Sequence, residues 1–145
     1  LSGEDTICLA QGLQTNMTLK RLDLHRNHIG DAGMKAIVEA LPNHPTMSAL
    51  AVSNNRITDS CMGLSTRLVR LREVHLDDNT ITDSGALDFC KSLMETNTGV
   101  NDSNHKTNGT KKIRLTLLNL CRNSLSEWGG DTIKRFLGTG VTVNY

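Results

Sequence analysis

Four copies of one eleven-residue pattern restrict the possible folds of this chain more than any other feature of its sequence. The copies share apolar residues at their first, fourth, sixth and eleventh positions and an asparagine at the ninth. They are LKRLDLHRNHI from Leu19, MSALAVSNNRI from Met47, LREVHLDDNTI from Leu71 and LTLLNLCRNSL from Leu115. A unit of this size cannot bury its own apolar side, so the repeats are expected to stack and share one core.

Each copy begins with the alternation that is typical of a short strand. Leu22 and Leu24 are expected to point into the core, while Arg21 and Asp23 point outward. An asparagine amide carries both donors and an acceptor, so it can satisfy backbone groups in the tight turn after a strand. We therefore interpret four asparagines as structural: Asn27, Asn55, Asn79 and Asn123.

A helical spacing follows three of the copies. IGDAGMKAIVEAL, ITDSGALDFCKSL and LSEWGGDTIKRFL each carry a glycine four residues after the first apolar residue, then apolar residues four and eight positions further on. This spacing predicts a helix, and Thr58, Thr82 and Ser126 stand where a helix N-cap is expected. The start of the chain, LSGEDTICLAQGL, fits the same spacing with Leu1, Leu9 and Leu13 at the apolar positions.

This alternation of an asparagine-ended strand with a helix resembles the leucine-rich repeat family and, within it, the ribonuclease-inhibitor-like subfamily. The resemblance implies an α/β fold, a leucine-rich-repeat solenoid whose strand and helix repeats form a curved right-handed stack with a parallel sheet on the concave face. We expect a single domain over residues 1–145, and we interpret it as a fragment of a longer array. Its expected units are a partial repeat over 1–18, repeats that start near 19, 47, 71 and 115, and a partial strand over 141–145.

The spacing between the asparagines departs from one regular repeat. The intervals are 28, 24 and 44 residues, so the second repeat is short by four and its helix, around Cys61 to Val69, is expected to be clipped. The third repeat contains a polar insertion over about 95–114, which we expect to be a mobile loop because it has little to bury. The insertion is either a docking or modification segment or a loop without a task.

The family binds partner proteins mostly through the outward residues of its strands, and the resemblance implies the same use here. The predicted partner-binding residues on the concave face are Arg21, Asp23, His25, Arg26, Glu73, His75, Asp77, Asp78, Asn119 and Arg122. The second strand contributes small residues such as Ala49 and Ala51. The charges then predict a banded surface, with a basic edge, a small neutral strip, an acidic band and a mixed strip.

Cys121 is expected to lie beside His75 and Asp77 on this face, which raises the question of a nucleophile or a metal site. A neighbouring carboxylate disfavours the thiolate that catalysis needs, and three possible ligands without a fourth make a poor metal site. We therefore expect no catalytic residue, no metal and no cofactor. The four cysteines form no C-x-x-C pair, and we interpret them as free thiols of an intracellular protein, cytoplasmic or nuclear.

Charge and hydropathy argue against several classes of partner. The formal net charge is +1 with both signs interspersed, which gives no electrostatic basis for binding nucleic acid or an anionic membrane. No apolar run approaches the roughly 20 residues that span a bilayer. A small-molecule substrate is not expected either.

These observations favour a non-catalytic protein-protein interaction module, part of an intracellular scaffold or regulator. Two alternatives stay open. The Ran GTPase activators resemble the same subfamily, but an activator needs a catalytic or orienting residue on a loop that this sequence does not identify. A structural part of a cytoskeletal assembly would instead bind through its exposed repeat ends.

Overall fold

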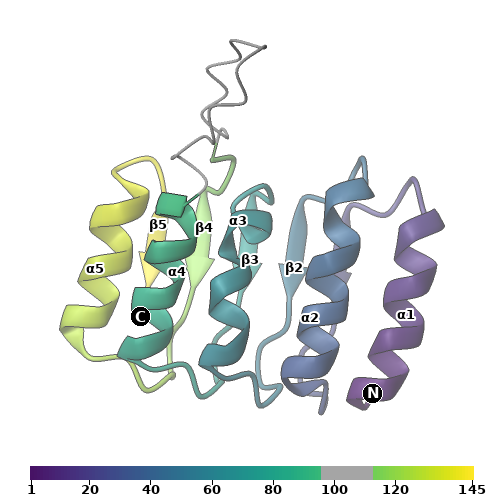
Figure 1. Ribbon diagram of the computed structural model, residues 1–145, viewed down its shortest axis with the longest axis horizontal. Helices are drawn as coiled ribbons and strands as arrows, with labels where there is room; N and C mark the ends of the chain where they lie inside the picture. The colour runs from purple at the N-terminus through teal and green to yellow at the C-terminus, as the bar shows by residue number, and fades with distance from the viewer. Residues whose placement is uncertain (96–112) are drawn as a thin grey trace, which may run out of the picture.

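The computed structural model describes residues 1–95 and 113–145 and consists of one layer of strands behind one layer of helices (Figure 1). The α-helices are α1 (Gly3–Thr15), α2 (Gly30–Ala40), α3 (Ser65–Leu68), α4 (Asp83–Glu95) and α5 (Glu127–Leu137), and the 3-10 helices are η1 (Leu41–Asn43) and η2 (Asp59–Leu64). The strands are β1 (Arg21–Asp23), β2 (Ala49–Ala51), β3 (Glu73–His75), β4 (Leu117–Asn119) and β5 (Thr142–Asn144). The polar insertion expected over about 95–114 lies almost entirely outside the described residues.

The strands form one parallel sheet in chain order, β1-β2-β3-β4-β5. The register is in phase, because the central residues of all five strands pair in one row: Leu22, Leu50, Val74, Leu118 and Val143. All of these side chains are buried against the helices. The predicted α/β solenoid with a parallel sheet is confirmed.

One continuous apolar core runs between the sheet and the helices from α1 to β5. Its centre lies under β2, β3 and β4, where Leu50, Val74 and Leu118 are fully buried. Each repeat thus completes its burial with its neighbours, as stacked repeats require.

The second repeat has the clipped helix that its short spacing predicts. The six residues of η2 and the four of α3 replace a continuous helix. Cys61 takes the position of the glycine and is buried. Four missing residues correspond to about one helical turn.

The first helix is capped more completely than the sequence pattern indicates. Ser2 and Asp5 form a reciprocal capping box at the start of α1, and the buried face consists of Thr6, Ala10 and Leu13. Leu1, which the pattern places at an apolar position, is instead 52% exposed. No helix within residues 1–95 and 113–145 has the length and apolar character needed to cross a bilayer.

Candidate functional site

The face of the sheet that the helices leave uncovered, called the concave face below, carries the predicted partner-binding residues. On its β1 side Arg21, Asp23, His25 and Arg26 are exposed. His25 Nδ1 lies 2.7 Å from Asp23 Oδ1, and hydrogen bonds from the side chain and backbone of His25 lower the pKa of the Asp23 carboxyl. This edge therefore presents cations beside an ionised carboxylate.

The neutral strip expected on β2 is not open to solvent. Ala49 and Ala51 are only 7% and 5% exposed, which corrects the prediction that they form part of the surface. Ala49 pairs with Arg21 on one side and Glu73 on the other, and the Arg21 guanidinium reaches over it to Glu73 Oε2 at 3.4 Å. Longer side chains from the flanking strands cover the short ones.

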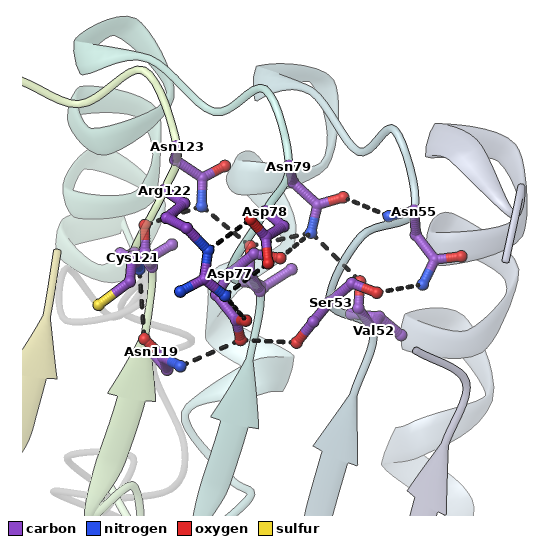
Figure 2. Close-up of polar contacts among 12 residues, drawn as sticks. Val52, Ser53, Asn55, Asp77, Asp78, Asn79, Asn119, Cys121, Arg122 and Asn123 are labelled. Carbon is purple, nitrogen blue, oxygen red and sulfur yellow. Dashed lines mark hydrogen bonds and ion pairs between the residues drawn. The ribbon is translucent and has the colours of Figure 1, made fainter. Parts of the chain in front are cut away.

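A hydrogen-bonded cluster centred on Asp77 occupies the middle of the concave face (Figure 2). Asp77 Oδ1 accepts hydrogen bonds from Ser53 Oγ at 2.6 Å and from Asn119 Nδ2 at 3.0 Å. Its other oxygen, Oδ2, accepts from Arg122 Nη2 at 3.2 Å. The Asp77 side chain, 15% exposed, thus joins residues that follow or belong to three neighbouring strands.

Arg122 covers the acidic band that the sequence predicts. Its Nε and Nη2 donate to the two carboxylate oxygens of Asp78, each at 2.5 Å, a paired geometry that holds the guanidinium in place. These hydrogen bonds lower the pKa of Asp78 and raise the pKa of Arg122. This one cation offsets one of the two negative charges of Asp77 and Asp78, so this part of the described surface is less acidic than the sequence predicts.

The turns after β1, β2, β3 and β4 each hold a residue in the left-handed conformation directly before the structural asparagine. These residues are Arg26, Asn54, Asp78 and Arg122, with φ of 55° or 56°, and the turn after β2 holds a second one, Arg56, with φ of 60°. This conformation is unfavourable for most side chains and easier for Asn and Asp. The sequence therefore indicated this conformation at Asn54 and Asp78. It did not indicate the same conformation at Arg26 and Arg122, because arginine has no preference for it.

The structural asparagines hold consecutive turns together. Asn79 Nδ2 donates to the carbonyls of Leu76 at 2.9 Å and of Val52, in the preceding repeat, at 3.2 Å. Asn79 Oδ1 accepts from the backbone N–H groups of Asn55 and Ile57. Asn55 and Asn123 also form side-chain hydrogen bonds to backbone groups of the preceding repeat. Asn27 Nδ2 donates to two carbonyls of its own turn.

A second ladder, at the start of the helices, was not predicted. Asp31, Asp59 and Asp83 each accept hydrogen bonds from the backbone N–H and the hydroxyl of the residue that begins the next helical segment, over distances of 2.6 to 2.8 Å. The bonded partners are Thr58, Thr82 and Ser126. The available signal was an Asp that recurs two residues after the isoleucine at the end of the first three eleven-residue copies.

Cys121, His75 and Asp77 do not form a joint site. The Asp77 carboxylate is occupied by other donors, and His75 Nε2 faces Glu73 Oε2 at 4.0 Å. The Cys121 backbone N–H donates to Asn119 Oδ1. Within the described part of the chain, no group of three His, Cys, Asp or Glu side chains could hold a metal ion.

The concave face is hollowed around the Asp77 cluster. The hollow measures about 420 Å³ and includes both the β1 cations and Arg122. Its charged and polar lining comprises Arg21, Asp23, His25, Arg26, Ser53, Asn54, His75, Asp77, Asp78 and Arg122. Eight of the ten predicted partner-binding residues line it. The other two, Asn119 and Glu73, contact lining residues, Asp77 and Arg21 respectively.

Comparison with known proteins places the chain among repeat proteins. The family model described as Leucine Rich repeat matches residues 15–38 and 71–90. Ribonuclease inhibitor of Mus musculus is 31% identical over 93 residues, which cover 60% of this chain and 20% of that protein. NACHT, LRR and PYD domains-containing protein 3 of Homo sapiens is 35% identical over 103 residues, which cover 65% of this chain and 10% of that protein. The chain thus matches a fifth or less of the length of these relatives.

A solved structure shows the same fold over nearly the whole chain. Leiomodin-1 Actin-Binding Site 2 superposes with a TM-score of 0.69 at 17% identity and covers 98% of this chain and 78% of that one. At this identity the likeness concerns the fold alone. The repeat pattern, the family model and the relatives agree. This chain carries leucine-rich repeats, and they are similar to the repeats of the ribonuclease inhibitors.

Proposed function

We propose that this chain binds a partner protein through its concave face and takes no part in catalysis. The observation that carries the proposal is the cluster around Asp77, which fixes charged groups from neighbouring repeats on one hollowed surface. Solenoids present this face as an extended binding surface. The name of the ribonuclease inhibitors, relatives at 31% identity, also refers to action on another protein.

Preordered side chains favour binding because little freedom remains to be lost. Immobilising a long side chain at an interface costs about 0.5–1.5 kcal/mol. Arg122 is exposed over 66% of its side chain, yet the two oxygens of Asp78 already hold its guanidinium. A partner can therefore contact an exposed cation whose orientation is set in advance.

The free cations of this face indicate what the partner contributes. Arg26 is exposed and forms no ion pair with another described residue. Arg21 contacts Glu73 and Asp23 at 3.4 and 3.8 Å, and its side chain is still 52% exposed. We infer that the partner surface places carboxylates opposite Arg21 and Arg26, which would set its orientation by charge complementarity.

The Asp77 carboxylate, the most central acidic group of the face, has a structural environment. Three donors occupy its oxygens, so it is not arranged to accept a proton from a substrate.

The thiols of Cys8, Cys61, Cys90 and Cys121 are free, which fits a reducing compartment, and we propose the cytoplasm or nucleus.

A pull-down from cell lysate with two matched triple variants tests the proposal. The concave variant carries Arg21→Gln, Arg26→Asn and Arg122→Asn, where asparagine tolerates the left-handed backbone of the last two positions. The control variant carries Lys35→Gln, Lys134→Gln and Arg135→Gln, which remove the same charge from exposed positions on α2 and α5. Circular dichroism first establishes that both variants fold like the wild type.

The expected result is a protein that wild type and control retain and the concave variant loses. Purified ribonuclease is added in a parallel binding assay, to test whether the similarity to ribonuclease inhibitor extends to its ligand. The proposal fails if both variants capture the same proteins as the wild type, which would direct attention to the repeat ends and the insertion. It also fails if the control loses the same proteins as the concave variant.

A further inference from the structure

A second hollow, about 330 Å³ in volume, lies at the edge of the sheet where the helical segments lead back into the strands. Its apolar wall includes Leu41 and Met47, between α2 and β2, and Leu71, between α3 and β3. Arginines from two repeats complete it: Arg67 and Arg70, at the end of α3, and Arg114, before β4. We call this the arginine pocket. It shares no lining residue with the hollow on the concave face.

Arg67, which lines the pocket, also carries a buried polar atom without a hydrogen-bond partner. Its Nη1 atom is buried and has no hydrogen-bond partner, and no other buried side-chain nitrogen or oxygen of the described residues shares this condition. A buried donor without a partner is costly, and nearly all such groups in folded proteins are paired. Arg67 therefore has donor capacity that no described group uses.

The charge of the pocket is also uncompensated. Arginine stays protonated at any ordinary pH, so Arg67, Arg70 and Arg114 bring three positive charges to one hollow. None of the three forms an ion pair with a carboxylate among the described residues, and no Asp or Glu lines the pocket. Clustered like charges repel one another, and an anion between them would reverse that contribution.

His44, which also lines the pocket, serves the fold. Its Nδ1 accepts a hydrogen bond from the Met47 N–H at 3.2 Å, and its Nε2 lies 3.3 Å from Asn16 Oδ1. Both ring nitrogens are thus committed to the loops before β1 and β2. A ligand in this pocket would therefore be bound by the three guanidinium groups.

We propose that the arginine pocket binds a phosphate group, carried by a phosphorylated side chain or present as free phosphate. A phosphate monoester carries a charge of about −1.5 to −2 at neutral pH and three acceptor oxygens, and the arginine fork matches phosphate oxygens with paired hydrogen bonds. A carboxylate brings a single charge and only two oxygens to three cations. The apolar wall of Leu41, Met47 and Leu71 provides contact for the carbon side of a phosphorylated side chain, while free phosphate would use the arginines alone.

Side-chain NMR of the whole 145-residue chain tests the proposal directly. The arginine Nε–Hε signals are followed while inorganic phosphate or O-phospho-L-serine is added at constant ionic strength, with L-serine as the uncharged comparison. The variants are Arg67→Gln and Arg114→Gln, and Arg135→Gln on α5 serves as the control. Arg114 is exposed, so its replacement keeps the test decisive if Arg67→Gln impairs folding.

We expect saturable shifts of the Arg67, Arg70 and Arg114 signals in the wild type and in Arg135→Gln. The apparent Kd should rise on the order of tenfold in Arg67→Gln and in Arg114→Gln. Tighter binding of O-phospho-L-serine supports a phosphorylated side chain as the ligand, and binding of phosphate that is as tight or tighter supports free phosphate. The proposal is overturned if neither probe gives a saturable shift, or if Arg135→Gln weakens binding as much as the pocket variants do.

Discussion

Asn79 bonds to more backbone groups than any other side chain of the asparagine ladder. Its amide nitrogen donates to Val52, Leu76 and Asp77, and its oxygen accepts from Asn55 and Ile57. Asn79 is almost fully buried, so water cannot replace these bonds if the side chain is removed. At this scale a single side chain connects the turns of adjacent repeats.

Replacement of Asn79 by alanine should lower the free energy of unfolding by about 3 kcal/mol or more, because buried donors and acceptors lose their partners. Asn27→Ala is the matched control. That asparagine is less buried: its amide nitrogen bonds within its own turn, and its oxygen accepts an exposed hydrogen bond from the N-terminal ammonium group of Leu1. We therefore expect a loss of about 1 kcal/mol. Urea unfolding followed by circular dichroism measures both values. Equal losses would show that the buried bonds of Asn79 to the preceding repeat add no stability.

Asp31 makes stability depend on pH in a defined direction. Burial opposes ionisation of this carboxyl, but hydrogen bonds from Thr58 and Cys61 outweigh it and lower its pKa below the ordinary value. A group whose pKa is lower in the folded state contributes stability above its unfolded pKa, about 3.9, and loses it as the pH falls through the folded pKa.

The Asp31→Asn variant should therefore be less stable than the wild type at neutral pH. Its stability should fall less than that of the wild type as the pH drops from about 5 through the folded pKa of Asp31. Urea unfolding at a series of pH values measures this difference. If the stability of the two proteins depended on pH in the same way, ionised Asp31 would not contribute to the stability of the folded state.

At the scale of the elements, the aspartate ladder explains why glycine stands near the start of the later helices. A Cβ atom on Gly85 would lie 2.3 Å from Asp59 Oδ1, and one on Gly129 would lie 2.1 Å from Asp83 Oδ1. Each glycine makes room for the carboxylate that caps its own helical segment from the preceding repeat. In the short second repeat Cys61 stands at this position and its thiol lies 3.3 Å from Asp31 Oδ1. Burial and then the charge of Asp31 raise the pKa of that thiol to about 12.

Gly85→Ala should destabilise the protein, although alanine normally stabilises a helix by roughly 0.5–1 kcal/mol relative to glycine. The added methyl group must displace Asp59 and so break its bonds to Thr82, and we expect a net loss of about 2 kcal/mol. Gly12→Ala in α1 is the control, since nothing lies within 4 Å of its Cβ position, and it should raise stability. Thermal unfolding compares the two, and a stabilising Gly85→Ala would contradict the role of the glycine.

The elements themselves could largely be predicted from the sequence, because the repeated leucines and asparagines report strand and turn directly. The clipped second helix followed from an interval of 24 residues. The aspartate ladder was missed because each of its bonds joins residues of different repeats: Asp31 and Thr58 are 27 positions apart. Hydropathy spacing contains no information on such bonds.

At the scale of the whole molecule, stacking brings together charges that are far apart in sequence. Arg122 and Asp78 are separated by 44 positions, across the insertion. Predicting the concave face required only the strand pattern. The partial neutralisation of the acidic band by Arg122 and the covering of Ala49 depended on side-chain length and direction. The face that results is a hollow with ordered charges, and the binding of a protein there is the central claim.

Arginine footprinting of the complex with the partner captured from lysate tests this claim most directly. Phenylglyoxal modification of Arg26 and Arg122 is compared by mass spectrometry with that of Arg135 on the helix side, with and without the partner. We expect the partner to protect Arg26 and Arg122 from modification, and Arg135 to react equally with and without the partner. Protection of Arg135, with Arg26 and Arg122 unchanged, would contradict the claim.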